Sequence, residues 1–468
     1  MMHRLLASCF CLILSMSLYA QDSLNMYQIY HWEDTTIPPA IFINNPYNEI
    51  WGWYDSTSQR EYAIIGSSIG THFFDITDEN NVQMVDYVAG RADRMIHRDY
   101  KNKGHYLYAV ADEFASSLQI IDMSYLPDSV SVVYDEDSLF QISHNVWVEG
   151  DRLYACIPRN WGSPNVKGGF GVYDISDPVN PTEIALYNEF GNIHDLYSRN
   201  DTVFLNAETS LYILDLKDPA QPEVIANVVT YPFQGYNHSG WASEDGRYYV
   251  MADETWGMPL KLFDLSDYSD PTIVSYLFPS MDLVNRDTLA IAHNPLIKGN
   301  YVYSSYYYDG VYIFDISNPQ FPTVVGFYDT YPDINDQDFK GAWGVYPFLP
   351  SGRILASDMQ TGLYVFGYTG PFQTSIEEGM NSRKLSGSLN AYPNPLQTEL
   401  NLETNELLSD WHISLYDELG RIVLHEKGES PRQSWEISLK NLSLPPGFYT
   451  LHMQSKQKQY YAKLIKQP

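Results

Sequence analysis

The chain has 468 residues, more than one hydrophobic core normally supports, so we expect a repeat-built domain, several domains, or both. Charged side chains make up only 18% of the residues and aromatic ones 15%, a balance typical of packed sheet and unlike that of disordered chains. The formal net charge of −30 repels phosphate groups, which argues against nucleic acid as a partner and against anionic membrane surfaces.

Residues 1–20 have the pattern of a secretory signal peptide. A basic start at His3 and Arg4 precedes an apolar stretch that ends at the small residue Ala20. This run is too short to span a membrane, and no other stretch approaches the roughly 20 residues that a transmembrane helix needs. We therefore expect a secreted protein without a transmembrane span. Only Cys156 then remains, in a strand-like apolar run that favours a buried structural thiol and excludes an intrachain disulfide.

An apolar run that ends in a short polar turn recurs between residues 50 and 370. Six clear copies end in Asp75, Asp122, Asp174, Asp215, Asp264 and Asp315, and LYVFGYTGP at 363 is a degenerate seventh copy. The copies lie 41 to 52 residues apart, which is the length of a propeller blade. We interpret the six aspartates as structural, because such carboxylates accept backbone N–H groups in the tight turn that follows.

Each copy divides into four strands separated by turn residues, most clearly in residues 290–328. The seventh copy stops at Gly370-Pro371, before its fourth strand. Met26–Trp32 has strand composition, so we predict that it completes the last blade and closes the ring. The predicted fold class is all-β, with a seven-bladed β-propeller over residues 21–373. The alternative is an open solenoid, but the fixed number of copies and the incomplete last blade argue against it.

Three strings carry a resemblance to a known family, namely YNHSGWASEDGRYYVMADE at 236, FDISNPQFPTVVGFYDTYP at 314 and KGAWGVYPFLPSGRILASDMQTGLYVF at 340. They resemble the LVIVD-repeat, or choice-of-anchor B, proteins of bacteria. The resemblance covers residues 48–367. It implies a secreted propeller and brings no settled activity with it.

The composition changes at Ala391, after residues 374–390, which lack periodicity and are expected to be a linker. Short alternating strands such as Trp411–Tyr416 and Phe448–Met453 predict a small β-sandwich over residues 391–468. AYPNP at 391, LYDELGRIV at 415 and LPPGFYTLHM at 444 resemble a type A sorting domain of the type IX secretion system, found in Bacteroidota. The resemblance implies recognition by that export machinery and a location at the outer-membrane surface or outside the cell.

Histidines and carboxylates recur at fixed repeat positions. The start of the inner strand in blades two to six carries His97, His144, His194, His238 and His293, and blades one and seven have Trp51 and Trp343 there. Second strands end in Asp112, Glu113, Glu208, Asp253, Glu254 and Asp358. In a four-stranded meander these two strand ends lie on one face. We therefore expect the side chains to meet around one mouth of the central channel.

Two interpretations of this mouth stay open. Imidazoles beside carboxylates can bind a divalent cation or act as an acid–base pair. The candidate metal ligands are His144, His194, His238 and His293. Polar side chains at repeated strand starts can equally serve the fold alone, by bonding to backbone and water. Trp161, Trp256 and Tyr306–Tyr308 offer an aromatic platform for a sugar or a peptide, although packing between blades explains the tyrosines as well.

The sequence has no phosphate loop, no HExxH or GxSxG string and no paired-cysteine metal motif. The first hypothesis is therefore a displayed binding or scaffold module, rather than an enzyme, with an unidentified glycan or protein as its ligand. The alternative is an extracellular hydrolase or lyase that uses histidine and carboxylate at the channel mouth. A third is an inert structural module. Propellers serve all three roles, so the fold does not distinguish them.

Overall fold

The computed structural model describes residues 23–162, 169–279, 290–332 and 338–370, and residues 389–466 apart from short gaps. The predicted signal peptide and most of the predicted linker lie outside these ranges. The chain divides into two compact units, here called the N-terminal unit (described residues between 23 and 370) and the C-terminal unit (described residues from 389). All the elements of the described residues are β-strands, and none of these segments forms an apolar helix of the length that a bilayer crossing needs.

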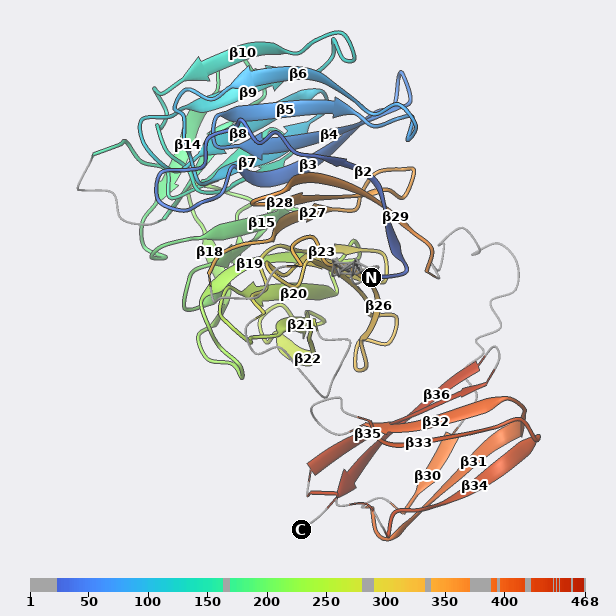
Figure 1. Ribbon diagram of the computed structural model, residues 1–468. Coiled ribbons are helices and arrows are strands. Elements are labelled where there is room, and N and C mark those ends of the chain that lie inside the picture. Colours follow the sequence, from blue (N-terminus) through green and yellow to red (C-terminus); the bar gives the residue numbers. More distant parts are fainter. Residues whose placement is uncertain are drawn as a thin grey trace, which may run out of the picture. The chain divides into compact units, whose positions relative to one another are not determined.

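The described residues of the N-terminal unit form seven antiparallel sheets that follow one another along the chain (Figure 1). The first sheet contains β3 (Tyr47–Asp55), β4 (Arg60–Ser67), β5 (Gly70–Asp75) and β6 (Gln83–Ala89). The second contains β7 (Arg98–Lys103), β8 (Tyr106–Ala111), β9 (Leu118–Asp122) and β10 (Ser131–Glu136). The third contains β11 (Val146–Glu149), β12 (Arg152–Cys156), β13 (Phe170–Asp174) and β14 (Thr182–Tyr187).

The fourth sheet contains β15 (Asp195–Arg199), β16 (Thr202–Asn206), β17 (Leu211–Asp215) and β18 (Glu223–Val228). The fifth contains β19 (Asn237–Ala242), β20 (Tyr248–Asp253), β21 (Leu260–Asp264) and β22 (Thr272–Leu277). The sixth contains β23 (Pro295–Lys298), β24 (Tyr301–Ser305), β25 (Val311–Asp315), β26 (Thr323–Tyr328) and β1 (Ser23–Leu24). The last contains β27 (Ala342–Tyr346), β28 (Ile354–Asp358), β29 (Gly362–Tyr368) and β2 (Met26–Trp32).

The first strand of each sheet faces the centre of the unit. These strands contact one another in the order β3, β7, β11, β15, β19, β23, β27, and β27 contacts β3. The apolar core lies between the sheets, because each neighbouring pair shares a buried hydrophobic cluster. Between the last and first sheets, for example, Leu363 and Val365 pack with Ile65 and Phe74. This is the arrangement of a β-propeller, in which sheets stack face to face around a channel.

The strand sequences explain the burial. Second and third strands such as β4 and β5 are buried almost throughout, with an apolar centre at residues 62–65 and 73–74, whereas outer strands such as β6 are largely exposed or half-buried. Within each sheet, the pairing between the third and the outermost strand of the repeat carries a register shift, as at Phe73/Phe74 in the first sheet. Such bulges increase the local twist of a strand pair.

The N-terminal segment joins the two ends of the unit. Strand β2 pairs antiparallel with β29, so that Met26–Trp32 supplies the fourth strand of the last sheet. Trp32 of this strand packs against Tyr47 and Phe74 of the first sheet, with ring centroids 5.6 and 4.9 Å apart. Ser23–Leu24, for which the sequence predicts no strand, adds β1 to the outer edge of the sixth sheet. The segment therefore contacts three sheets.

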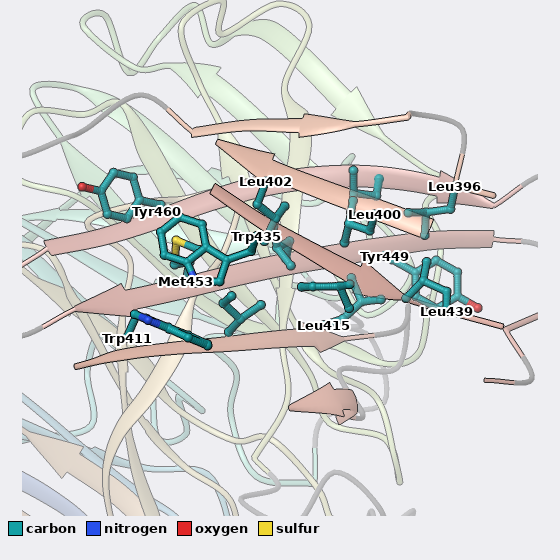
Figure 2. Close-up of a cluster of buried hydrophobic side chains, with 14 of the residues drawn as sticks. Leu396, Leu400, Leu402, Trp411, Leu415, Trp435, Leu439, Tyr449, Met453 and Tyr460 are labelled. Carbon is teal, nitrogen blue, oxygen red and sulfur yellow. The ribbon is translucent and has the colours of Figure 1, made fainter. Parts of the chain in front are cut away.

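The C-terminal unit contains two antiparallel sheets. One consists of β30 (Leu389–Tyr392), β31 (Glu399–Leu408) and β34 (Arg432–Ser438), and the other of β33 (Ile422–Gly428), β32 (Trp411–Tyr416), β35 (Gly447–Ser455) and β36 (Lys458–Lys466). Both contribute to one buried cluster, in which Leu402 and Trp435 meet Trp411 and Met453 (Figure 2). Strand β30 begins at Leu389, which lies inside the range 374–390 expected for the linker. Leu389 packs against this cluster, but the polar residues on either side of it hide the alternation that would predict a strand.

Candidate functional site

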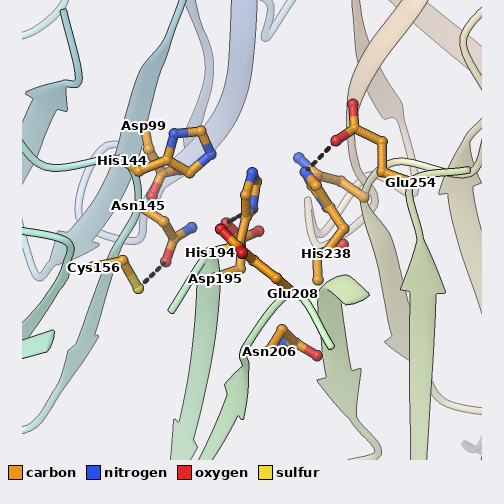
Figure 3. Close-up of polar contacts among 12 residues, drawn as sticks. Asp99, His144, Asn145, Cys156, His194, Asp195, Asn206, Glu208, His238 and Glu254 are labelled. Atoms are coloured by element: carbon orange, nitrogen blue, oxygen red, sulfur yellow. Dashed lines mark hydrogen bonds and ion pairs between the residues drawn. The ribbon is translucent and has the colours of Figure 1, made fainter. Parts of the chain in front are cut away.

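The five histidines at the repeated position come together in the N-terminal unit and form a ring with Trp343. The ring centroids of successive members lie 4.8 Å apart for His97–His144, 4.0 Å for His144–His194, 4.2 Å for His194–His238, 4.4 Å for His238–His293, 4.6 Å for His293–Trp343 and 5.2 Å for Trp343–His97. Figure 3 shows His144, His194 and His238 beside one another. We call this set the histidine ring.

Repeated backbone geometry places these imidazoles. His144, His194 and His293 precede their inner strands and donate their backbone N–H groups to Cys156, Asn206 and Ser305, at 3.0, 2.8 and 3.0 Å. Each acceptor is the last residue of the second strand in the same sheet. His238 lies instead inside β19, at a register shift between Asn237 and Ser239. The start of the first strand and the end of the second therefore meet at the ring, as the meander predicts.

Carboxylates occupy the side of the ring formed by His97 and His144. Oδ1 of Asp112 lies 2.9 Å from Nδ1 of His97, and Oδ2 lies 2.5 Å from Nδ1 of His144, so that one carboxylate joins two imidazoles. Oε1 of Glu113 also contacts Nδ1 of His97, at 2.6 Å. The second oxygen of Glu113 accepts the backbone N–H groups of Ile96 and His97 at 2.9 and 3.2 Å.

These contacts raise the pKa values of His97 and His144. Burial by itself lowers the pKa of an imidazole, but Asp112 and Glu113 outweigh it and raise the pKa of His97 well above its ordinary value. Asp112 also raises the pKa of His144 against the effect of burial. In return, the two imidazoles hold the pKa of Asp112 well below its ordinary value, although burial acts in the opposite direction.

On the other side of the ring the pKa values of the imidazoles are lowered. Burial and the neighbouring imidazoles lower the pKa of His194 and, more strongly, that of His238. Burial lowers the pKa of His293 to about 4. Nδ1 of His194 lies 3.2 Å from Oδ1 of Asp195, and Nδ1 of His293 donates to the carbonyl oxygen of Trp343 at 2.5 Å.

Among the described residues, groups of three side chains place nitrogen and oxygen atoms within 4.8 Å of one another, the spacing from which a metal ion can be held. The groups are His97–Asp112–His144, His144–His194–Asp195 and His194–His238–Glu254. Of the predicted metal candidates, His144, His194 and His238 belong to such groups and His293 does not.

The remaining predicted carboxylates lie elsewhere. Asp253 accepts hydrogen bonds from Lys261 Nζ at 2.6 Å and Tyr231 Oη at 2.9 Å, in a pair whose side chains are both 0% exposed. Asp358 is buried and accepts from Thr330 Oγ1 at 2.7 Å, and burial raises its pKa. The structure does not bring these two carboxylates to the histidine ring, because buried polar partners bind them: Lys261 and Tyr231 bind Asp253, and Thr330 binds Asp358.

Glu208 lies near the histidine ring and is connected to it through another side chain. Its Oε1 accepts from Asn192 Nδ2 at 3.0 Å and from Tyr236 Oη at 3.3 Å. The ring of Tyr236 is 5.3 Å from that of His194, so Glu208 is linked to the histidine ring through this tyrosine.

Trp51 does not join the ring, which corrects the prediction made for the first blade. Strand β3 already begins at Tyr47, with a register shift between Tyr47 and Ile50, so that Trp51 lies deeper along the strand. Its Nε1–H donates to Asn102 Oδ1 at 2.8 Å, and its ring lies 4.9 Å from that of Tyr346.

A small chamber of about 50 Å³ lies among the inner strands, with Trp51 in its wall. Its polar lining includes Glu49, Asp99, Lys101, Asp195 and Asn294, and its apolar lining includes Trp147 and Trp241. Burial, together with the charge of Asp99, raises the pKa of Glu49 to about 8. The sequence analysis missed these acids, although Asp99 and Asp195 follow His97 and His194 by two and one residues.

Exposed aromatic side chains stand beside the mouth in two groups. Phe114, next to Glu113, lies between Phe42 and Trp161, with ring centroids 6.2 and 5.3 Å away. Phe339 lies 6.0 Å from Trp256 and 5.6 Å from Tyr307, whose own ring is 5.1 Å from that of His293. Phe42, Trp161, Trp256 and Phe339 are 68, 52, 42 and 38% exposed. We call these four side chains and Phe114 the aromatic rim.

The repeated aspartates make one common contact. Oδ1 of each accepts the backbone N–H group of the residue two positions later, at 2.7 to 3.0 Å, in Asp75, Asp122, Asp174, Asp215, Asp264 and Asp315. These are turn contacts, which support the structural interpretation of the six aspartates. Cys156 is buried and free, and burial raises the pKa of its thiol well above the ordinary value, which keeps the thiol unreactive.

Comparison with known families finds matches in both units. Residues 142–189 and 291–330 match the LVIVD repeat, and residues 390–467 match the secretion system C-terminal sorting domain. The chain therefore carries LVIVD repeats and a sorting domain. That domain marks proteins exported by type IX secretion, so this protein is exported to the cell surface or the extracellular space. None of the curated proteins matches the chain.

Solved structures resemble the chain at low identity. The periplasmic gluconolactonase of Pseudomonas aeruginosa is 11% identical, with 84% of this chain and 99% of that chain covered and a TM-score of 0.50. A protein from Lactobacillus plantarum is 12% identical, with 84% and 100% covered and a TM-score of 0.49. The Cps50 β-propeller domain of Myceliophteria thermophila is 12% identical, with 70% and 98% covered and a TM-score of 0.48. At these identities the likeness concerns the fold alone.

Proposed function

We propose that this exported LVIVD-repeat protein is a closed seven-bladed propeller over residues 21–373, which acts as a binding module. The sheets of the described residues, the contact of β27 with β3 and the pairing of β2 with β29 support the closed ring. The two sheets and the shared core of the C-terminal unit support a sandwich from Leu389 onward, after a short linker. In this proposal residues 1–20 are the signal peptide.

The observation that carries the binding role is the histidine ring with the aromatic rim beside it. Binding sites typically combine apolar and aromatic surface with a few placed polar groups, and the mouth offers both. Asp112, Glu113 and Glu254 are exposed by 13 to 17% at their side chains, so they are within reach of solvent. The mouth therefore combines hydrogen-bonding groups with flat aromatic faces.

The negative charge of the chain disfavours anionic ligands. The chain carries a net charge of −30, and carboxylates line the mouth, so an anionic ligand is repelled before it arrives. A neutral glycan suits the site, because its hydroxyl groups can bond to carboxylate and imidazole while its apolar faces pack on aromatic rings. We therefore propose a neutral extracellular glycan as the ligand.

A binding role accounts for these groups better than a hydrolase or lyase does. A general base must have an oxygen or nitrogen free to accept a proton from the substrate. Both oxygens of Asp112 are already bonded to His97 and His144, and one oxygen of Glu254 accepts from Tyr307 at 2.5 Å. Asp112 is therefore not available as a general base, and a binding role does not require one.

The test is binding of the mature protein, purified from the culture medium, to an array of neutral glycans. The variant carries Trp161→Ala and Trp256→Ala, and the matched control carries Tyr125→Ala. Tyr125 is 58% exposed and follows the end of β9, away from the end of β8 that leads to Asp112. We expect glycan binding that falls at least tenfold in the rim variant and is unchanged in the control.

Two results contradict the proposal. One is that the wild-type protein binds no neutral glycan, including the case in which it captures an envelope protein instead. The other is that the rim variant and the control bind alike.

A further inference from the structure

Within the histidine ring, carboxylates already occupy the Nδ1 atoms on the His97–His144 side. Asp112 contacts both Nδ1 atoms, and Glu113 adds a second contact to His97 at 2.6 Å. A carboxylate bonded in this way has little capacity left for another partner. The remaining arc, formed by His194, His238 and His293, has a different arrangement.

Hydrogen bonds to fixed acceptors set the tautomers of two imidazoles in this arc. Nδ1 of His194 faces Oδ1 of Asp195 at 3.2 Å, and Nδ1 of His293 faces the carbonyl oxygen of Trp343 at 2.5 Å. Both partners accept hydrogen bonds, so both Nδ1 atoms carry the proton. The Nε2 atom of each neutral ring then has a free lone pair. A carboxylate behind one ring nitrogen is the usual support of a metal-binding histidine.

Glu254 is held in the same manner. Tyr307 Oη donates to Oε1 of Glu254 at 2.5 Å. The other oxygen, Oε2, lies 3.9 Å from Nε2 of His238, which is too long for a hydrogen bond. One carboxylate oxygen is therefore fixed from behind, and the second is directed to the imidazole, as the dashed contact in Figure 3 indicates.

The Nδ1 atom of His238 is buried without a hydrogen-bond partner among the described residues. The side chain of His238 is 3% exposed. The other nitrogen, Nε2, faces Oε2 of Glu254 at 3.9 Å, too far for a hydrogen bond, so it is the nitrogen available to a metal ion beside Glu254. His238 belongs to the group whose ligand atoms lie within 4.8 Å of one another.

We propose that His194, His238 and Glu254 form a binding site for one divalent transition-metal ion of the Zn²⁺ class. Two imidazole nitrogens and one carboxylate oxygen are donors that such ions prefer, whereas Ca²⁺ and Mg²⁺ prefer oxygen alone. Ligands of a tetrahedral ion with bonds of about 2.0–2.1 Å lie roughly 3.3 Å apart, so modest rotations of Glu254 and His194 complete the geometry. Three protein ligands leave one position open toward the mouth.

The other two groups are poorer sites. In His97–Asp112–His144 the oxygens and nitrogens are already bonded to each other. In His144–His194–Asp195, Nδ1 of His194 and Oδ1 of Asp195 are bonded to each other, and Nδ1 of His144 is bonded to Asp112. The site shares Glu254 and two imidazoles with the mouth proposed to bind the glycan, but none of its ligands belongs to the aromatic rim, so the rim variant and the metal-ligand variants test the two proposals separately.

The experiment is a calorimetric titration of the untagged mature protein, stripped of metal with a chelator, with Zn²⁺. Glu254→Gln and His194→Gln remove one ligand each and keep the side-chain size. His97→Gln is the control, because it alters the same ring on the side where carboxylates occupy the Nδ1 atoms. Co²⁺ serves as a second probe, since its visible absorption reports nitrogen and oxygen coordination, and thermal melting checks that each variant is folded.

We expect one Zn²⁺ per chain, with an affinity that falls at least tenfold in Glu254→Gln and His194→Gln and stays within about threefold in His97→Gln, and no comparable binding of Ca²⁺. The Co²⁺ absorption should be lost in the two ligand variants. The proposal is overturned if the wild type binds no Zn²⁺, if the ligand variants bind like the wild type, or if His97→Gln loses as much as they do. Glycan binding is measured separately, with and without chelator, so that failure of one proposal leaves the other testable.

Discussion

Nδ1 of His293 donates to the carbonyl oxygen of Trp343 at 2.5 Å, and the two rings lie 4.6 Å apart, which links the sixth and last sheets at the mouth. Trp343 is 5% exposed and packs with Tyr307 and Met359 in a small apolar cluster. The tryptophan therefore acts as a wall of the histidine ring.

Replacing Trp343 with alanine should open a cavity in this wall. We expect the free energy of unfolding to fall by about 3–5 kcal/mol, as for other buried aromatic residues. Urea denaturation of the purified mature protein measures it. Trp161→Ala, at a side chain that is 52% exposed, is the control and should change stability by less than about 0.5 kcal/mol. Equal losses in both variants would show that Trp343 has no special packing role.

Trp32 should stabilise the junction between the last and first sheets. It belongs to β2 but packs against Tyr47, His72 and Phe74 of the first sheet, with centroid distances of 5.6, 5.0 and 4.9 Å. We expect Trp32→Ala to lower the free energy of unfolding by about 2–3 kcal/mol. Tyr27→Ala, on the same strand and 50% exposed, should cost about 1 kcal/mol or less. If the two variants denature alike, the junction does not depend on this tryptophan.

Glu49 should make stability depend on pH. Burial and the charge of Asp99 raise the pKa of Glu49 from 4.5 to about 8, so folding favours its protonated form. The resulting stabilisation is complete below pH 4.5 and is lost as the pH rises through 8. Glu49→Gln does not titrate, so its stability relative to the wild type should improve between pH 5 and 9 by roughly 1–3 kcal/mol. A difference in the free energy of unfolding between the two proteins that stays constant from pH 5 to 9 would refute this prediction.

The turn aspartates allow a conservative comparison. Oδ1 of Asp315 accepts the backbone N–H group of Ser317 at 2.7 Å. Asp315→Ala removes this acceptor and should cost about 1 kcal/mol, whereas Asp315→Asn keeps a carbonyl oxygen in the same place and should cost much less. Chemical denaturation separates the two. An equal loss of stability in the two variants would mean that the charge of Asp315, and not its hydrogen bond in the turn, stabilises the protein.

Deleting residues 391–468 should abolish export without unfolding the propeller. The sorting domain has its own buried core, and the N-terminal unit has separate clusters. Immunoblots of cells and medium should find the truncated protein inside the cell envelope and the full chain outside. Trp343→Ala in the full-length chain controls for loss of stability and should still be exported. Secretion of the truncated protein would contradict the role of the sorting domain.

Most of the fold of the N-terminal unit can be predicted from the repeat pattern. Copies 41 to 52 residues apart predict the sheets, because each copy repeats the same turn residues between apolar strands. It also predicts that the five histidines meet, since a shared repeat position becomes a shared height in the channel. It fails for Trp51, because the register shift in β3 moves this side chain along the strand and leaves no mark in the spacing.

The partners of the histidines are harder to predict. Asp112 and Asp253 both end a second strand, yet Asp112 meets two imidazoles while Asp253 pairs with buried Lys261. The difference depends on a lysine in a neighbouring strand, which the position of Asp253 does not reveal. Asp195 and Asp99 escape notice for another reason, because they lie at the starts of inner strands, where the histidines stand out, and not at the ends of second strands. The aromatic rim depends on contacts between loops of different sheets, such as Phe42 with Phe114.

The most direct test of the central claim, that the mouth of the histidine ring is the binding surface, is hydrogen–deuterium exchange of the mature protein with and without its array-selected neutral glycan. We predict slower exchange in peptides that contain Glu113, Trp161, Glu254 and Phe339, and unchanged exchange in the outer strands β6, β10 and β14. Protection confined to those outer strands, or no protection anywhere, would contradict the account.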